Sequence, residues 1–271
     1  MKAAYYYADP TGNITLLAPL PPAGTDAGRE AEMLMRLEPA AEQAGFLGGG
    51  GPGYELSLQM AGGEFCGNAA LSAAAVYCLN AGINCEEAET VRVSVSGAAE
   101  PVPVRIRETG SGCFEGTVSM PAPLEIFTYS FRSGGEEYAF PAVRFEGITH
   151  LLSFSAVEKK TAERIVKEQC SALQADALGL MLIDKEAGTL LPVVYVPKSG
   201  TLFWESSCAS GTAAAGAWLR KAFGGGKWEF TEPGGRLIIE APEDGRLLLT
   251  GSVRVTAKEM NPPATAWPSP L

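Results

Sequence analysis

The chain of 271 residues is long enough for two domains, and it can bury a core without disulfides or a structural metal. Its net charge of −10 argues against nucleic acid and anionic membranes as partners, because both attract basic surfaces. The first residues lack the apolar stretch of a secretory signal, and no apolar run reaches the length of a membrane span. We therefore expect a cytoplasmic protein with no membrane partner.

Six cysteines are present: Cys66, Cys78, Cys85, Cys113, Cys170 and Cys208. Without an export signal they are expected to be free thiols in a reducing compartment. No Cys-x-x-Cys pair occurs and His150 is the only histidine, so no metal site is expected.

The first half of the chain mixes predicted strands and helices. Residues 3–7 and 14–18 are predicted to form a hairpin that turns at PTGN, and residues 24–39 a helix with Thr25 or Asp26 as N-cap. A glycine-rich loop precedes the short strand YELSLQM, and an alanine-rich helix begins after Cys66. The segments ETVRVSVSG, EPVPVRIRE and FEGTVSMPAP alternate apolar and polar residues, which predicts three more strands.

The second half follows a similar order. EEYAFPAVRFEG and ITHLLSFS are predicted strands, and VEKKTAERIVKEQCSAL is a predicted amphipathic helix. The strand-like runs ALGLMLID and LLPVVYVP precede Cys208, where a second alanine-rich helix begins. Strands are predicted at WEFTEP, RLIIEAP, GRLLLTG and VRVTAKEM, and the proline-rich tail from Asn261 is predicted to be irregular.

The two alanine-rich segments indicate a degenerate internal repeat. CGNAALSAAAVYCL and CASGTAAAGAWL both begin with a cysteine and run from small residues to apolar ones. A plainer interpretation is that small residues recur wherever a helix packs tightly against a sheet. A cysteine is also often just a small, inert core residue, and we accept that reading for the other four cysteines.

A cysteine at the start of a helix lies in the positive field of the helix N-terminus, which can activate its thiol. The N–H groups of a first helical turn lack helical partners and favour an anion, and the same field lowers a thiol pKa. If two such helices face each other across a cleft, one sulfur can take the α-proton of an amino acid while the other returns a proton to the opposite side. Converging N–H donors would stabilise the enolate-like charge, so this inversion needs no cofactor.

Several motifs resemble the diaminopimelate epimerase superfamily over almost the whole chain. EFCGNAA resembles its first cysteine motif, SSCASGTAA its second, PTGN its glycine–asparagine turn and EGITH its glycine-to-histidine loop. VSMPAP resembles the segment that closes the first domain, and EPGGRLIIEAPEDGRLLLTG resembles the C-terminal glycine-rich strands.

The resemblance implies an α+β fold with two pseudo-symmetric domains, each a mainly antiparallel β-sheet or barrel wrapped around a central α-helix. We expect residues 1–122 in the first domain, with a possible strand from residues 252–271, and residues 123–251 in the second. The implied activity is a cofactor-independent amino-acid racemase or epimerase, an isomerase with Cys66 and Cys208 as its acid/base pair. The implied substrate contacts are Asn13, Gly67, Asn68, His150, Ala209 and Ser210.

Two departures bear on the substrate. TLFWESSC lacks the arginine that diaminopimelate epimerases carry before the second cysteine, and Ile148 stands where an asparagine is usual. Both departures disfavour a substrate with a second amino-acid head. The segment before Cys208 resembles more closely the histidine racemases of the same superfamily, and so does EQAGF, which implies that Glu42 or Gln43 approaches the substrate. The expected partner is a small-molecule amino-acid substrate, with histidine ahead of diaminopimelate.

Other readings stay open. Glu64 and Glu205 flank the cysteines, and each is either a solvated loop carboxylate or a group that tunes the site. His150 is either a hydrogen-bonded histidine at a strand end or a substrate contact. The whole protein could also be a thiol redox protein, a binding module that has lost the chemistry, or an isomerase of the phenazine-biosynthesis type. A homodimer is a candidate assembly.

Overall fold

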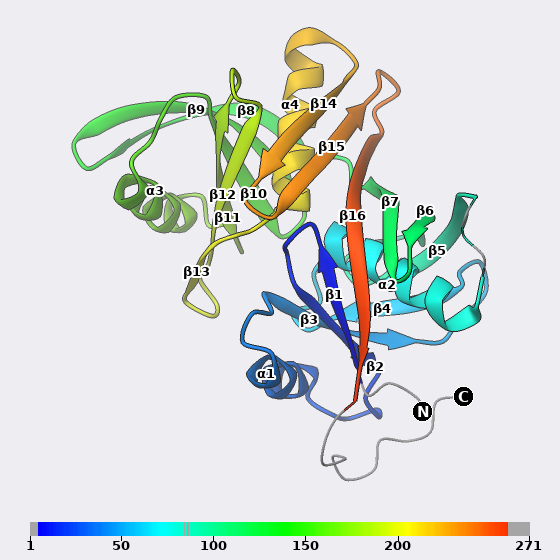
Figure 1. Ribbon diagram of the computed structural model, residues 1–271. Coiled ribbons are helices and arrows are strands. Elements are labelled where there is room, and N and C mark those ends of the chain that lie inside the picture. Colours follow the sequence, from blue (N-terminus) through cyan, green and yellow to red (C-terminus); the bar gives the residue numbers. More distant parts are fainter. Residues whose placement is uncertain (1–4, 84, 86, 260–271) are drawn as a thin grey trace. The chain divides into compact units, whose positions relative to one another are not determined.

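The computed structural model describes residues 5–83, 85 and 87–259, and its chain divides into two compact units (Figure 1). Unit 1 holds the described residues up to Ser119 and those from Thr250 onward, and unit 2 is Met120–Leu249. The predicted irregular tail from Asn261 lies outside the described residues.

Unit 1 is a closed barrel. Its strands follow the order β1 (Tyr5–Pro10), β2 (Thr15–Pro19), β3 (Gln43–Gly48), β4 (Leu56–Met60), β5 (Glu89–Val95), β6 (Val102–Gly110), β7 (Cys113–Met120) and β16 (Leu247–Lys258). Antiparallel pairing of β16 with β1 closes the barrel. β16 also neighbours β15, so the chain passes from unit 2 to unit 1 within this strand.

Helix α2 (Gly67–Ala81) is the central helix of unit 1. It contacts β1, β2, β4, β5 and β6, and most of its residues are buried on every side. A helix that is apolar all round belongs in a core, and its many alanines keep it narrow enough for strands to surround it. Helix α1 (Ala27–Leu37) packs Ala31 and Leu34 against the barrel instead, and Asp26 is its N-cap, as predicted.

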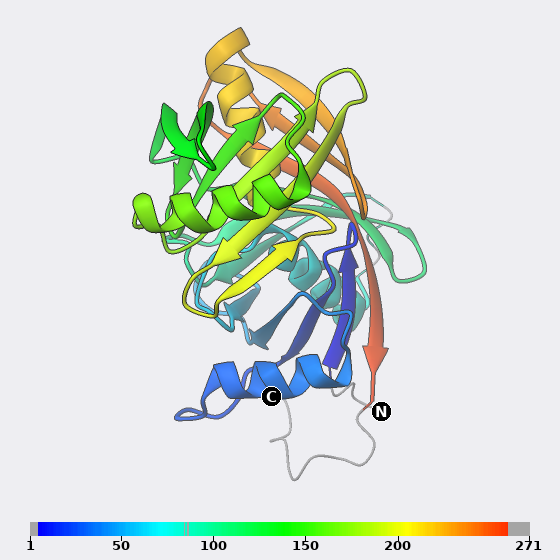
Figure 2. The same ribbon diagram turned by 90° about the vertical axis from the view of Figure 1, so that its left-hand side faces the viewer.

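Unit 2 is built in the same way around helix α4 (Ala209–Phe223). Its strands follow the order β15 (Gly235–Ala241), β14 (Gly226–Glu232), β12 (Thr189–Val196), β11 (Leu178–Asp184), β10 (Ile148–Ser153), β9 (Glu136–Phe145) and β8 (Glu125–Ser133), and β13 (Thr201–Trp204) pairs with β12. α4 contacts β9, β10, β11, β14 and β15, whereas helix α3 (Lys159–Ala172) packs on β8, β11 and β12 (Figure 2).

The predicted fold class of two pseudo-symmetric domains is confirmed by the strand pairing. From β1 to β6 the pairs are antiparallel, parallel, antiparallel, parallel and antiparallel. The same sequence of pairs runs through β9, β10, β11, β12, β14 and β15. α1 and α3 occupy equivalent places in this order, and so do α2 and α4. The internal repeat is therefore a repeat of topology.

Some elements differ from the sequence prediction. β3, β8 and β13 were not predicted, and the segments GRLLLTG and VRVTAKEM form the single strand β16. Gly251 lies inside β16, and buried and less buried residues alternate along the whole stretch from Leu247 to Val255. β3 is short and contains Gly45, and it is a strand because β2 and β4 pair with its two edges.

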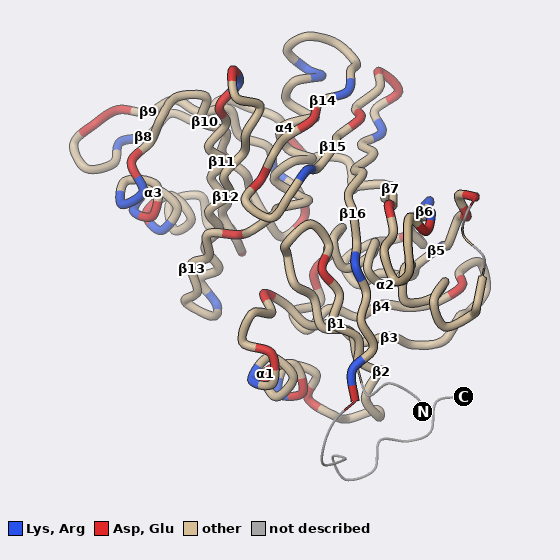
Figure 3. Tube along the Cα trace, viewed as in Figure 1, with Lys and Arg blue, Asp and Glu red and all other residues tan. Residues whose placement is uncertain are grey.

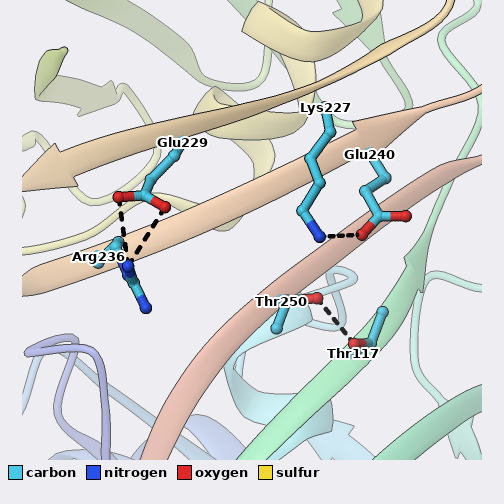
Figure 4. Close-up of polar contacts among 6 residues, drawn as sticks. All are labelled: Thr117, Lys227, Glu229, Arg236, Glu240 and Thr250. Carbon is cyan, nitrogen blue, oxygen red and sulfur yellow. Dashed lines mark hydrogen bonds and ion pairs between the residues drawn. The ribbon is translucent and has the colours of Figure 1, made fainter.

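Charged side chains contribute little to this architecture. Figure 3 shows Lys and Arg interspersed with Asp and Glu along the elements of each unit. On β14 and β15, Lys227 pairs with Glu240 and Arg236 with Glu229, all partly exposed (Figure 4). Exposed pairs of this kind contribute about 0–1 kcal/mol each. The hydrogen bond of 2.7 Å between Thr117 of β7 and Thr250 of β16 is also drawn there.

Among helices formed by described residues, none is long and apolar enough to cross a membrane.

Candidate active site

Cys66 is the N-cap of the central helix of unit 1. Its backbone is extended (φ −132°, ψ 114°), and its sulfur accepts a hydrogen bond from the N–H of Ala69 at 3.4 Å. Oxygen side chains usually take this position. The first turn of α2 carries no acidic residue, so the positive end of the helix acts on the sulfur.

A network of hydrogen-bonded polar side chains, from β2, β3 and the residues that precede each strand, ends at the sulfur of Cys66. The thiol of Cys66 donates to Oε1 of Gln43 over 3.2 Å. Nε2 of Gln43 donates to Oδ1 of Asn13 at 2.6 Å and to Oγ1 of Thr15 at 2.8 Å. Nδ2 of Asn13 donates in turn to Oε2 of Glu42 at 2.6 Å. The parallel register of β2 and β3, which places Thr15 opposite Gln43, builds this network.

The turn that presents Asn13 is strained. Thr11 has a φ of 54°, which is unusual for a β-branched residue. Its hydroxyl donates to the carbonyl oxygen of Ser252 at 3.2 Å, and Oδ1 of Asp9 accepts from the N–H of Gly12 at 2.7 Å. Strain held in this way is typical of functional sites. Unit 1 thus brings together the predicted site residues Asn13, Gln43 and Cys66.

Gly67 and Asn68 form the first turn of α2, directly after Cys66, and both are buried. The backbone oxygen of Asn68 accepts from the hydroxyl of Ser72 at 2.9 Å, which is one turn further along the helix. The two predicted carboxylate contacts of unit 1 therefore lie at the same helix end as the thiol.

Cys208 occupies the equivalent place in unit 2, but its helix is capped differently. Its backbone is again extended (φ −128°, ψ 98°), yet its sulfur makes no capping hydrogen bond. Instead, Oε2 of the buried Glu232 accepts from the backbone N–H of Cys208 at 2.7 Å, and Oε1 accepts from the hydroxyl of Thr212. The N–H of Gly234 donates to the carbonyl oxygen of Ser206 at 2.8 Å, which ties the turn after β14 to the loop before Cys208.

Burial dominates the proton affinities of these two groups. It raises the pKa of Glu232 to about 8, although the hydrogen bonds from Thr212 and Cys208 act in the opposite direction. Burial also raises the pKa of Cys208 well above its usual value. The negative charge and hydrogen bond of Glu205 raise it further, the charge of Glu232 adds to this, and the hydrogen bond with Ser210 lowers it.

His150 lies on β10 and reaches the same helix end. Its Nε2 is 2.9 Å from Oγ of Ser210, and that Oγ is 3.6 Å from the sulfur of Cys208. Gly179 faces His150 across the β10–β11 pair, and a Cβ there would lie 2.3 Å from Nδ1, so only glycine leaves room for the ring. Burial lowers the pKa of His150 to about 3, which keeps the imidazole neutral. Unit 2 thus brings His150, Ser210 and Cys208 together.

Glu205 and Ala209 lie on either side of Cys208 in the sequence. Ala209 begins α4 directly after Cys208 and is buried, and Glu205 precedes the cysteine in the connecting loop. The hydrogen bond and charge of Glu205 raise the pKa of the Cys208 thiol, and a contact between Glu205 and the substrate stays a prediction.

Sequence reasoning missed Glu232, Thr212 and Thr15. A signal for Glu232 was present, because in β14 the inward positions alternate and Glu232 follows Phe230 at the next inward position. A glutamate in the inward register of an amphipathic strand indicates a buried carboxyl with a specific partner. Across the described ranges 5–83, 85 and 87–259, no group of three His, Cys, Asp or Glu residues is placed to hold a metal ion.

Comparison with known proteins agrees with this architecture. A hydroxyproline epimerase from Agrobacterium vitis, solved with bound trans-4-hydroxy-L-proline, shares the fold, with a TM-score of 0.67 and 16% identity over 93% of this chain and 90% of that chain. A histidine racemase from Fusobacterium nucleatum is 31% identical over 92% of this chain and 93% of its own length. A histidine racemase from Staphylococcus aureus is 27% identical over 85% of both chains.

Together the fold and these relatives define an amino-acid racemase, an enzyme of the isomerase class. The model of the histidine racemase CntK N-terminal domain matches residues 2–260. The chain belongs to this family of histidine racemases, which confirms the resemblance found in the motifs.

Proposed function

We propose that the protein interconverts L- and D-histidine without a cofactor, with Cys66 and Cys208 as the two acid/base groups. The observation that carries this proposal is the equivalence of the two cysteines. Each is the N-cap of the buried central helix of its unit, and each has polar side chains within reach of its sulfur. An inert core cysteine needs neither the helix terminus nor the polar neighbours.

In the proposed reaction the two sulfurs act on opposite sides of one α-carbon. A thiolate takes the α-proton, and the other cysteine delivers its thiol proton to the opposite side. One proton enters and one leaves, so the product is the other enantiomer and the two cysteines have exchanged protonation states. The next turnover of the same enantiomer then requires a proton exchange that restores the first state.

The carbanion between these steps is the difficult intermediate. Its charge spreads onto the substrate carboxylate, which we place against the first-turn N–H groups after each cysteine, at Gly67, Asn68, Ala209 and Ser210. N–H donors aimed at a developing charge act strongly where water is excluded. His150, held neutral by burial, is suited to hydrogen bonding with the substrate rather than to repelling its ammonium group.

Histidine is proposed as the substrate because the curated relatives carry that name and because the loop before Cys208 lacks an arginine. A second amino-acid head, as in diaminopimelate, would leave a charged carboxylate without that partner. We also propose a cytoplasmic location, because both thiols must stay reduced to transfer protons.

The test is to incubate the protein with a panel of L-amino acids in D2O and to follow α-deuterium uptake by NMR and enantiomer ratio by chiral chromatography. We expect histidine to show both signals. Cys66→Ser and Cys208→Ser should each lower kcat by about 10²–10⁴-fold. Cys113→Ser is the matched control, because this partly exposed thiol on β7 is outside both helix termini, and it should keep full activity.

Two outcomes would contradict the proposal separately. Turnover of diaminopimelate with none of histidine would show that the substrate is wrong. Histidine turnover that survives either cysteine substitution would show that the acid/base assignment is wrong.

A further inference from the structure

A chain of hydrogen bonds with a fixed direction runs from Glu42 to the sulfur of Cys66. Its members are Glu42, Asn13, Gln43 and Cys66, and their contacts are 2.6, 2.6 and 3.2 Å long. Each side-chain amide has a donor end and an acceptor end, so the group at one end of the chain decides which end the next amide presents.

The carboxylate sets the direction. An ionised Glu42 can only accept, so Asn13 must turn its Nδ2 toward it and its Oδ1 toward Gln43. Gln43 then presents Nε2 to Asn13, which leaves Oε1 toward the sulfur. The atom that Gln43 presents to the sulfur of Cys66 is therefore an acceptor, Oε1.

Thr15 supports the direction that Glu42 sets. Its hydroxyl donates to the backbone oxygen of Asn13 at 3.1 Å, so its oxygen is left to accept from Nε2 of Gln43 at 2.8 Å. Thr15 is fully buried and Asn13 is 6% exposed, so water cannot easily replace these partners. Reversing the amide of Gln43 would place its Oε1 against the oxygens of Asn13 and Thr15.

We propose that Glu42 is a positioning residue that holds Cys66 as the proton-donating thiol in the substrate-free protein. A thiol satisfies the oxygen of Gln43, whereas a thiolate would face it with like charge. The N–H of Ala69 donates to the sulfur in either protonation state. This inference deepens the proposed function, on which it rests, by assigning the protonation state in which Cys66 meets the substrate.

Other acidic groups near the thiol must be separated from Glu42. Glu64 lies two residues before Cys66 in the same loop. Asp9 lies at the end of β1, where its Oδ1 accepts from the N–H of Gly12. Neither is a member of the chain that fixes Gln43.

The test measures the rate of Cys66 alkylation by iodoacetamide against pH, by mass spectrometry of the peptide that contains it. Glu42→Gln replaces a carboxylate that can only accept with an amide that can also donate, so the amides can reverse and Nε2 of Gln43 can stabilise the thiolate. We expect the alkylation midpoint to fall by about one pH unit, which is a tenfold faster reaction below the midpoint.

A second variant keeps the charge of Glu42. Asn13→Ala combined with Thr15→Val removes both acceptors from Nε2 of Gln43, which can then turn to the sulfur, and the midpoint should fall as well. Glu64→Gln is the matched control for the loss of one negative charge, and it should leave the midpoint within a few tenths of a pH unit. Circular dichroism would show that each variant is folded.

The proposal is overturned if the double variant leaves the Cys66 midpoint unchanged, or if Glu64→Gln lowers it as much as Glu42→Gln does. The second result would mean that charge alone is responsible. All measurements use substrate-free protein, so they do not depend on whether histidine is the substrate, and failure of the racemase proposal would be seen separately in the D2O assay.

Discussion

The backbone N–H of Cys208 donates a hydrogen bond of 2.7 Å to Oε2 of Glu232, which lies 24 residues further along the chain. In unit 1 the sulfur of Cys66 accepts from its own helix instead, at the N–H of Ala69. The two halves repeat the same topology, yet among the residues that the structure describes a buried carboxyl lies at only one of these two helix termini. The two thiols are therefore chemically different although their backbones are equivalent.

Glu232→Gln should change how stability depends on pH. Burial raises the pKa of Glu232 from 4.5 to about 8, so between these values the folded protein holds a proton that the unfolded chain has lost. The contribution of Glu232 to stability is thus full below pH 4.5 and is lost as pH rises toward 8. As pH rises through this window, the free energy of unfolding of the variant should increase relative to that of wild type by up to about 1.4 kcal/mol per pH unit, measured by urea unfolding.

Glu229→Gln is the control for this experiment, because Glu229 lies on the same strand but is half-exposed and paired with Arg236. It should show no such trend. Parallel stability curves for wild type and Glu232→Gln would mean that the carboxyl is ionised in the fold throughout this range.

His150 should have the opposite effect. Burial lowers its pKa from 6.5 to about 3, so between these values the unfolded chain binds a proton that the folded protein excludes. Stability from this group is complete above pH 6.5 and is lost as pH falls toward 3. Wild type should therefore lose about 1.4 kcal/mol per pH unit more than His150→Gln over the acidic range, measured by urea unfolding.

The imidazole can also be observed directly, because the chain has a single histidine. Its ring proton signals in NMR, assigned by their loss in His150→Gln, should stay constant from pH 8 to pH 5. A titration with its midpoint between pH 6 and 7 would contradict the buried, neutral state.

Glu205→Gln should make Cys208 more reactive. Burial is the largest cause of the raised pKa of this thiol, and the charge and hydrogen bond of Glu205 come next. Removing that charge should move the alkylation midpoint of Cys208 to lower pH, read by mass spectrometry. Ser210→Ala should move it to higher pH, because the Ser210 hydrogen bond lowers this pKa. Shifts of the same sign in both variants would refute this account.

Gly179→Ala should destabilise unit 2. The added Cβ would lie 2.3 Å from Nδ1 of His150, which cannot move away freely inside the core. Overpacking of this kind costs about 1–3 kcal/mol in unfolding free energy, measurable by urea titration. Gly110→Ala is the control, because Gly110 also lies in a strand, at the end of β6, and a Cβ there meets nothing within 4 Å. Equal losses in both variants would show that the effect is not a clash with His150.

Local patterns in the sequence were sufficient for much of the fold and half of the site. Asp26 as an N-cap, the alternation of ETVRVSVSG and the small residues after each cysteine are features of neighbouring residues, so they can be recognised without the fold. The placement of Cys66 and Cys208 at the start of two alanine-rich helices was predicted for the same reason, and the topology repeats as the sequence indicated.

Only the tertiary structure decided which distant side chains surround each sulfur. The strand β3 exists because β2 and β4 pair with its edges, and that pairing brings Gln43 to Thr15 and to Cys66. Glu232 reaches Cys208 through the packing of β14 beside α4. Contacts of this kind depend on strand register and burial over the whole unit, which set the pKa of a group more strongly than its chain neighbours do. The sequence therefore determined the thiols and their helices, and the fold determined their proton affinities.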